Sequence, residues 1–129
     1  RIYPLENLVP LTLIVPFMSA PIARTPEPPY YAAIFTSRLG DEADGYPEMA
    51  ARMEELAARS PGYLGLESVR DAGGHGITVS YWASEEAIRE WKDQSQHQIA
   101  QETGRARWYA EYRVRIAKVE RAYGFSGGP

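Results

Sequence analysis

Strand-like and helix-like stretches follow one another in a fixed order from Tyr30 onward, and this order constrains the fold more than any other feature. The strand patterns, which are rich in β-branched and aromatic residues, cover residues 30–37, 63–70, 77–82 and 111–120. One helix pattern separates the first strand from the second, and another separates the third from the last. The order β-α-β-β-α-β predicts an α+β fold of the ferredoxin-like type, with both helices on one face of an antiparallel sheet.

Both faces of the predicted sheet carry apolar side chains. Tyr31 and Ile34 fall on opposite sides of the first strand, and Val79 and Trp82 fall on opposite sides of the third. Two helices cover only one face, so the other face needs a further apolar layer. A second copy of the same sheet supplies that layer most simply, which predicts a homodimer whose two sheets form one α/β barrel.

Turn and capping residues set the expected ends of the helices. Residues 41–45 have the chemistry of a turn, Pro47 suits the first helical turn, and Ser-Pro-Gly at 60–62 ends the first helix. Ser84, followed by two glutamates, predicts the N-terminus of a second helix that continues to Gly104.

Two irregular features are expected in the sheet. The glycine-rich segment 71–76 predicts a hairpin turn that contains His75 as an exposed residue. In the last strand the apolar alternation slips between Ile116 and Val119, which predicts a β-bulge there.

Composition excludes several classes of function. The 129 residues suit one domain, and 14 basic against 17 acidic residues give no reason to expect a nucleic-acid partner. The chain has no cysteine, which excludes disulfides, thiolate metal sites and a cysteine nucleophile, and which fits a cytoplasmic protein. No acidic cluster with metal-ligand spacing, phosphate-binding loop or Ser/His/Asp constellation is evident, so no metal site is expected.

Three regions differ in character along the chain. Residues 1–29 form a proline-rich apolar arm, residues 30–125 the domain, and residues 126–129 a short tail. The apolar part of the arm, residues 8–18, is too short and too interrupted by prolines to span a bilayer, so no membrane partner is expected. A secretory signal is the weaker alternative for this arm; docking on the domain or on a neighbouring subunit is the stronger one.

Aromatic side chains gather between residues 76 and 125, which suggests a lined pocket for a flat molecule. His97 lies in the same stretch, and its imidazole suits either proton transfer or axial ligation of haem. The alternative for His97 is a partly buried structural histidine, and each aromatic residue can equally be core or interface. The aromatic members of the stretch include Trp82, Trp91, Trp108, Tyr109 and Tyr112.

The sequence resembles the antibiotic biosynthesis monooxygenase (ABM) family, and within it the haem-degrading branch. The resemblance is carried by Ser-Pro-Gly-Tyr-Leu-Gly at 60–65, Gly-Ile-Thr-Val-Ser-Tyr-Trp at 76–82, Trp91 with His97, Trp-Tyr at 108–109 and Val-Glu-Arg at 119–121. It implies a dimeric barrel with a pocket between sheet and helices in each subunit. Members of the family oxidise aromatic polyketide-type phenols without metal or flavin, or bind and open haem.

The haem-opening members use an Asn on the first strand and a Trp and a His on the second helix. Matching this sequence to them puts Ser37, Trp91 and Gln101 at those positions, so two of the three residue types differ. His97 lies six residues after Trp91, about 240° around a helix, and shares its face only if the helix breaks near residues 93–95.

These considerations predict a cofactor-independent monooxygenase for a planar aromatic, polyketide- or quinol-like molecule. The alternatives are a haem-binding or haem-degrading protein and a non-enzymatic barrel that binds a small ligand. His97, Tyr81 and Tyr112 are the candidate acid/base residues. The expected substrate-binding residues are Phe35, Ser37, Trp91, Gln101, Trp108 and Tyr109.

Overall fold

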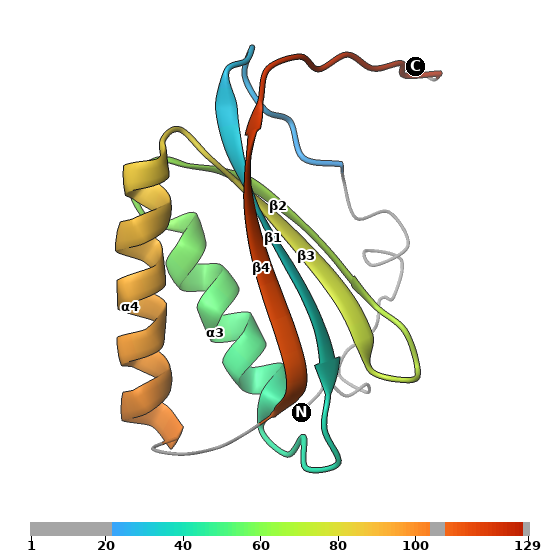
Figure 1. Cartoon of the computed structure of the whole chain (residues 1–129), viewed down its shortest axis with the longest axis vertical. Helices are drawn as coiled ribbons and strands as arrows, with labels where there is room; N and C mark the ends of the chain where they lie inside the picture. Colours follow the sequence, from blue (N-terminus) through green and yellow to red (C-terminus); the bar gives the residue numbers. More distant parts are fainter. Residues whose placement is uncertain (1–21, 104–107, 128–129) are drawn as a thin grey trace.

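The computed structural model describes residues 22–103 and 108–127, with the backbone alone for residues 99–103. Its elements follow the predicted order, and Figure 1 shows them along the chain. They are β1 (Tyr30–Leu39), α3 (Tyr46–Ala58), β2 (Tyr63–Arg70), β3 (His75–Trp82), α4 (Glu85–Thr103) and β4 (Tyr109–Val119). The ferredoxin-like α+β fold is therefore confirmed.

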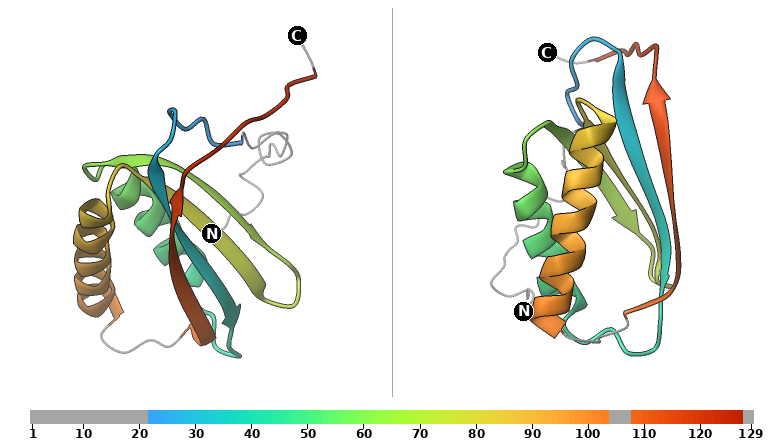
Figure 2. Two further views of the ribbon diagram at one scale, coloured as in Figure 1. Left: turned by 45° about the horizontal axis from the view of Figure 1, so that its top comes forward. Right: turned by 60° about the vertical axis from the view of Figure 1, so that its left-hand side comes forward.

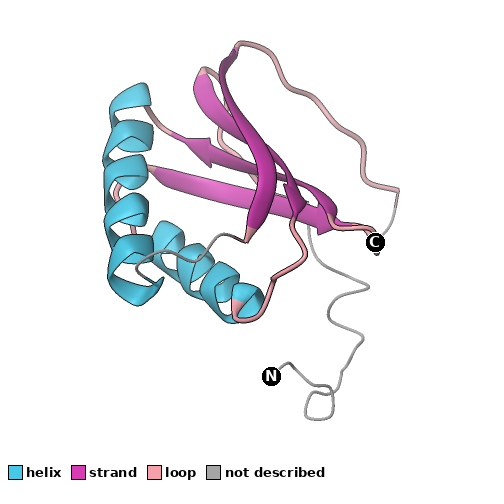
Figure 3. Cartoon of the chain, turned by 60° about the horizontal axis from the view of Figure 1, so that its bottom comes forward, coloured by secondary structure: helices cyan, strands magenta, loops and turns pink. Residues whose placement is uncertain are grey.

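The four strands form one antiparallel sheet in the order β2-β3-β1-β4. Both helices lie on one face of this sheet, as Figure 3 shows from below and Figure 2 from the side. No helix in the described ranges covers the opposite face, which we call the open face.

The strand register decides which side chains meet the helices. Tyr31 pairs with Trp82 and Ala33 pairs with Ser80, so these four residues share one face. Trp82 is completely buried on this face and stacks on Trp91 of α4, with ring centroids 6.1 Å apart. It is the centre of the core cluster formed by Ala33, Ala57, Trp82, Ala87 and Ile88.

The helix starts agree with the capping residues. Gly45 precedes α3 with a φ of 86°, a left-handed conformation that glycine adopts without strain, and a proline stands in the first turn. At α4 the Ser84 Oγ accepts a hydrogen bond from the Ala87 backbone N–H at 3.0 Å, so Ser84 is the N-cap. α4 continues without a break through residues 93–95.

Two expectations about the sheet were wrong. The hairpin turn is shorter than predicted, because His75 is already the first residue of β3 and pairs with Arg38. The predicted bulge between Ile116 and Val119 does not exist, since β4 pairs regularly with β1 over that stretch. These two apolar side chains lie on opposite faces of a regular strand, and the register shift lies instead at the end of β1, between Arg38 and Leu39.

The described part of the N-terminal arm packs on the open face. The Ala23 backbone N–H donates to the Glu67 carboxylate at 3.0 Å, and the Thr25 hydroxyl donates to the Tyr30 hydroxyl at 2.8 Å. The apolar segment 8–18 lies outside the described residues. No helix in the part of the chain described above is long and apolar enough to cross a membrane.

The chain after β4 leaves the sheet. Residues 120–127 extend away from the body of the domain, as the left view in Figure 2 shows. Tyr123 and Phe125 are more than 90% exposed there, so they contribute nothing to the core of this subunit.

Candidate functional site

The two helices cover the β2–β3 half of their face of the sheet more fully than the β1–β4 half. α3 packs against β2 and α4 against β3, where the Trp82 core lies. On β4 three large apolar side chains that point to the same face as Phe35 are about half exposed. They are Tyr112, Val114 and Ile116, at 55%, 48% and 45%. This half of the helix-covered face therefore presents an apolar surface that solvent reaches.

Four aromatic rings meet on this surface, and we call them the tyrosine cluster: Phe35, Tyr46, Tyr109 and Tyr112. Phe35 stacks on Tyr112 with ring centroids 5.3 Å apart and meets the edge of Tyr109 at 5.2 Å. Tyr109 in turn lies 5.6 Å from Tyr46 at the start of α3. β1, α3 and β4 thus contribute to one continuous aromatic patch, as large flat ligands require.

Arg70 of β2 closes one end of the cluster. Its Nη2 donates hydrogen bonds to the Ser37 hydroxyl at 2.8 Å and to the Tyr46 hydroxyl at 3.1 Å. The guanidinium also lies over the Tyr46 ring, 5.2 Å from its centroid, in cation–π geometry. The site therefore has an aromatic part and a cationic end.

Tyr109 of the cluster is a hydrogen-bond donor rather than a base. Burial raises the pKa of Tyr109 far above its ordinary value, and a hydrogen bond with Tyr46 and the repulsion between the two hydroxyls when both are ionised raise it further. The positive charge of Arg70 lowers the same pKa, but by less than burial raises it. Tyr109 therefore keeps its proton at neutral pH and can donate it in a hydrogen bond.

Four of the predicted site residues come together in or beside the cluster: Phe35, Ser37, Tyr109 and Tyr112. Trp91 lies on the same face but at the core, half-buried against Trp82. Trp108 is buried, and its indole N–H donates to the Asp44 carbonyl at 2.9 Å, so it holds the loop before α3. The side chain of Gln101 lies outside the described residues.

Two of the predicted acid/base residues do not reach the cluster. Tyr81 points to the open face, where its hydroxyl donates to the Glu67 carboxylate at 2.8 Å. Burial, followed by this hydrogen bond, raises the pKa of Tyr81 to about 12. His97 is exposed on α4, and because that helix is unbroken, it does not share a face with Trp91.

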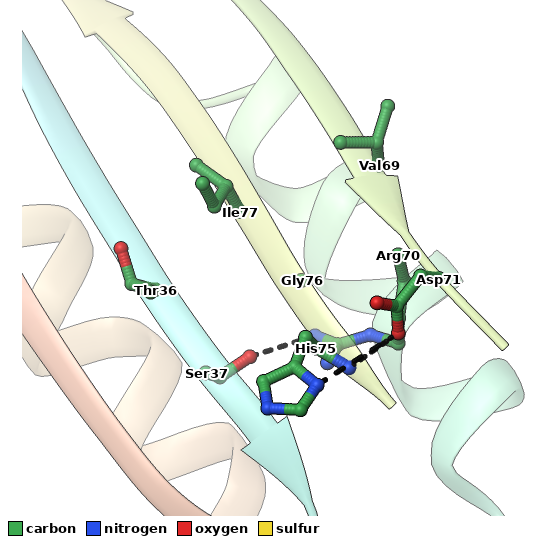
Figure 4. A pocket seen from close by; sticks show the side chains of 8 residues that line it. All are labelled: Thr36, Ser37, Val69, Arg70, Asp71, His75, Gly76 and Ile77. Carbon is green, nitrogen blue, oxygen red and sulfur yellow. Dashed lines mark hydrogen bonds and ion pairs between the residues drawn. The ribbon is translucent and has the colours of Figure 1, made fainter. Parts of the chain in front are cut away.

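A hollow of about 430 Å³ lies near the hairpin end of the sheet, and its lining includes Ser37, Arg70 and Gly76 from the cationic end of the site. Figure 4 shows Thr36, Val69, His75 and Ile77 around it. Val69 is 73% exposed and Ile77 46%, so the hollow is largely apolar. His75 Nδ1 lies 4.0 Å from the Asp71 carboxylate at its rim, a distance at which an exposed pair contributes little.

Comparison with known proteins identifies the family to which the chain belongs. A family model for antibiotic biosynthesis monooxygenases matches residues 31–103, from β1 to the end of α4 and more than half of the chain. The chain belongs to the antibiotic biosynthesis monooxygenase family. The resemblance drawn from the sequence is confirmed, and the match ends before β4, which contributes Tyr109 and Tyr112 to the site.

A curated relative of this ABM protein is the uncharacterized protein YqjZ of Bacillus subtilis (strain 168). It is 56% identical over 100 residues, which span 78% of this chain and 88% of YqjZ. Because YqjZ is itself uncharacterized, the relation defines no substrate.

Solved structures of other proteins share the fold. SnoaB, a cofactor-independent oxygenase from Streptomyces nogalater, has a TM-score of 0.57 at 10% identity and covers 74% of this chain and 97% of its own. A variant of MhuD with two manganese protoporphyrin IX molecules bound per active site has a TM-score of 0.53 at 19% identity, with coverages of 76% and 99%. At such identities the likeness shows the fold alone.

The described residues fit a histidine-ligated haem poorly. Both histidines of this ABM protein are exposed and lie away from the tyrosine cluster: His75 points to the open face and His97 lies on the exposed side of α4. In the ranges that the structure covers, no three His, Asp or Glu side chains are grouped to hold a metal ion.

Tyr46 and Arg70 were missed by the sequence analysis. Each becomes part of the site only through strand pairing and helix placement, which bring Arg70 opposite Gly76 and, one strand further, near Ser37. Gly76 was a signal in the sequence that could have pointed to Arg70, because a glycine within a strand often marks the close approach of another group.

Proposed function

We propose that this ABM-family protein is a monooxygenase that oxidises a planar aromatic substrate on the tyrosine cluster without a bound cofactor. The observation that carries the proposal is the solvent-reachable stack of Phe35 and Tyr112, with Tyr109 at its edge. Flat aromatic molecules stack favourably on such rings. The family relation and the shared fold of SnoaB, named as a cofactor-independent oxygenase, support the reaction class.

In such a reaction the substrate must supply the electrons. A ring CH₂ of an anthrone-like molecule, ionised to its enolate, is oxidised to C=O by O₂; one oxygen atom enters the product, and the other leaves as water with the two hydrogens of the CH₂ group. The tyrosine cluster consists of phenylalanine and tyrosine side chains, and neither residue type is ordinarily a base at neutral pH. Their part is to hold the ring flat and to donate hydrogen bonds to its oxygens.

We also propose that the open face is covered by a second copy of the chain. The apolar side chains of this face include Ile34, Val69, Ile77 and Val79, and two of them are strongly exposed. A sheet with one uncovered apolar face gains stability when the same face of a second copy packs on it. The dimeric barrel of the family is the corresponding assembly.

Oxygen uptake tests the proposed activity. We expect an anthrone substrate, which carries the ring CH₂, to consume O₂ in the presence of the protein. Tyr112→Ala should lower kcat/KM by about 10-fold or more, since an aromatic contact and its buried area contribute about 1.5 kcal/mol. The matched control is Tyr123→Ala, which removes a tyrosine that is 91% exposed on the C-terminal segment.

Each outcome has a definite meaning. Equal effects of Tyr112→Ala and Tyr123→Ala on kcat/KM would contradict the placement of the substrate. Tight binding of the aromatic molecule without oxygen uptake would contradict the oxygenase and support a ligand-binding barrel instead. A haem titration followed at the Soret band serves as the parallel test for haem binding.

A further inference from the structure

Arg70, Gly76 and Ser37 lie in one row across β2, β3 and β1. Arg70 pairs with Gly76, and Gly76 pairs with Ser37. The Arg70 side chain crosses the glycine to reach the serine, as the dashed line in Figure 4 shows. A Cβ atom at position 76 would stand only 2.5 Å from the Arg70 Cζ. The path of the guanidinium therefore depends on the missing side chain of Gly76.

All the polar partners of this guanidinium are neutral. Besides Ser37 and Tyr46, its Nη1 donates to the Gly74 carbonyl at 2.6 Å. These three hydrogen bonds and the contact with the Tyr46 ring involve no carboxylate. A guanidinium has five N–H donors, and these contacts use three of them. The charge of Arg70 is thus held in a fixed place by three hydrogen bonds to neutral groups.

The position of this charge relates directly to the aromatic part of the site. Arg70 lies over the Tyr46 ring, and Tyr46 contacts Tyr109. Its partner Ser37 pairs on the other side with Tyr112, whose ring stacks on Phe35. The guanidinium therefore lies beside the Ser37 end of the cluster, where a flat molecule on Phe35 and Tyr112 would meet it if the molecule extended toward Ser37.

We propose that Arg70 binds an anionic oxygen on the edge of the aromatic substrate, either a ring-conjugated phenolate or enolate or a carboxylate, and that Gly76 positions Arg70 for this. The proposal rests on the function proposed above and names its substrate class: acidic aromatic molecules. A planar guanidinium suits such oxygens because it donates two parallel hydrogen bonds. For the oxygenation, the same contact would favour the ionised, electron-rich form of the substrate.

Binding measurements separate charge from shape. The probes are 2-naphthoate and its neutral analogue 2-naphthamide, measured by isothermal titration calorimetry. The native protein should prefer 2-naphthoate. Arg70→Gln should lower the affinity for 2-naphthoate by about 10- to 100-fold, the usual range for a hydrogen bond to a charged group. The affinity of the same variant for 2-naphthamide should stay within about twofold of the native value.

Gly76→Ala provides a second variant that keeps every charge. The new methyl group occupies the path of the guanidinium, and only a flexible side chain has to move to admit it. We expect Gly76→Ala to lose the preference for 2-naphthoate as Arg70→Gln does. Arg113→Gln is the matched control, because Arg113 pairs with Thr36 and points to the open face. It should leave both affinities unchanged.

A phenol probe distinguishes the two kinds of anionic oxygen. Binding should lower the pKa of 4-nitro-1-naphthol, read from its visible absorbance, and Arg70→Gln should abolish this shift. A shift with the phenol assigns the site to phenolates or enolates, and a preference for 2-naphthoate alone assigns it to carboxylates; both support the anion site. If the native protein shows neither the pKa shift nor the preference for 2-naphthoate, the anion site is wrong. It is also wrong if Arg70→Gln and Arg113→Gln lose affinity for the anionic probe equally.

The anion site and the oxygenase can fail separately. If charge-dependent binding is found without oxygen uptake, the anion site stands and the proposed reaction fails. If Arg70→Gln and Gly76→Ala turn over the oxygenase substrate with unchanged kcat/KM, the reaction stands and the role of Arg70 fails.

Discussion

Replacing Ile77 with glutamate tests whether the open face is a subunit interface. Ile77 lies at the rim of the hollow on this face and is 46% exposed in a single chain. Since its side chain is already half in water, Ile77→Glu should change the stability of one subunit by no more than about 1 kcal/mol, within the range of strand preferences. A large effect on assembly would therefore come from the interface.

The size of that effect can be estimated. Full burial of an isoleucine contributes about 1.5–3 kcal/mol, so covering its exposed half contributes about 1 kcal/mol. A carboxylate that loses water without gaining a partner costs about 1–3 kcal/mol more. In a twofold dimer both copies carry the change, which gives about 4–8 kcal/mol in total. The dissociation constant should rise by roughly a thousandfold or more.

Sedimentation equilibrium of the native and variant proteins measures this constant directly. Val114→Glu is the matched control, because Val114 is 48% exposed in the same sheet but points to the helix-covered face. We expect Ile77→Glu to be monomeric at micromolar concentration and Val114→Glu to remain dimeric. A native protein that is already monomeric, or an Ile77→Glu variant that dimerises as tightly as the native chain, would refute the reasoning.

Two further predictions concern residues outside the cluster. His97→Ala should leave kcat/KM within about twofold of the native value and the melting temperature nearly unchanged, because His97 is exposed. A roughly 100-fold loss of turnover in the oxygen-uptake assay would instead show that His97 transfers a proton in the reaction. Since the pKa of Tyr81 is raised to about 12, its hydrogen bond to Glu67 stabilises the fold below pH about 10 and is lost as the pH rises through about 12. Tyr81→Phe should therefore remove a late step from the tyrosinate absorbance titration, and an unchanged titration would contradict the assignment.

Local patterns in the sequence were enough to predict the elements of the fold. Each strand and helix is defined by residues close together in the chain, such as Ser84 with the two glutamates that follow it. The errors occurred where local patterns compete. His75 follows two glycines and looks like a turn residue, yet pairing with Arg38 extends β3 to include it.

The site was less predictable because its contacts are distant in sequence. The role of Trp108 depends on the Asp44 carbonyl, and that of Arg70 on Ser37 and Tyr46. The aromatic residues near the C-terminal end did include two members of the cluster, Tyr109 and Tyr112. Whether His97 joined them depended on one unknown, the continuity of α4, which the sequence left open.

The row of Arg70, Gly76, Ser37 and Tyr112 extends across all four strands, so its members become neighbours only when every strand is paired. A shift of one residue in any of these pairings would send a member of the row to the opposite face. A ligand held by the row would thus recognise the correctly registered chain and add stability to that state alone. In a hydrogen-exchange experiment, such a ligand should slow the exchange of backbone amides in all four strands together. Substrate binding would then select the fully folded chain.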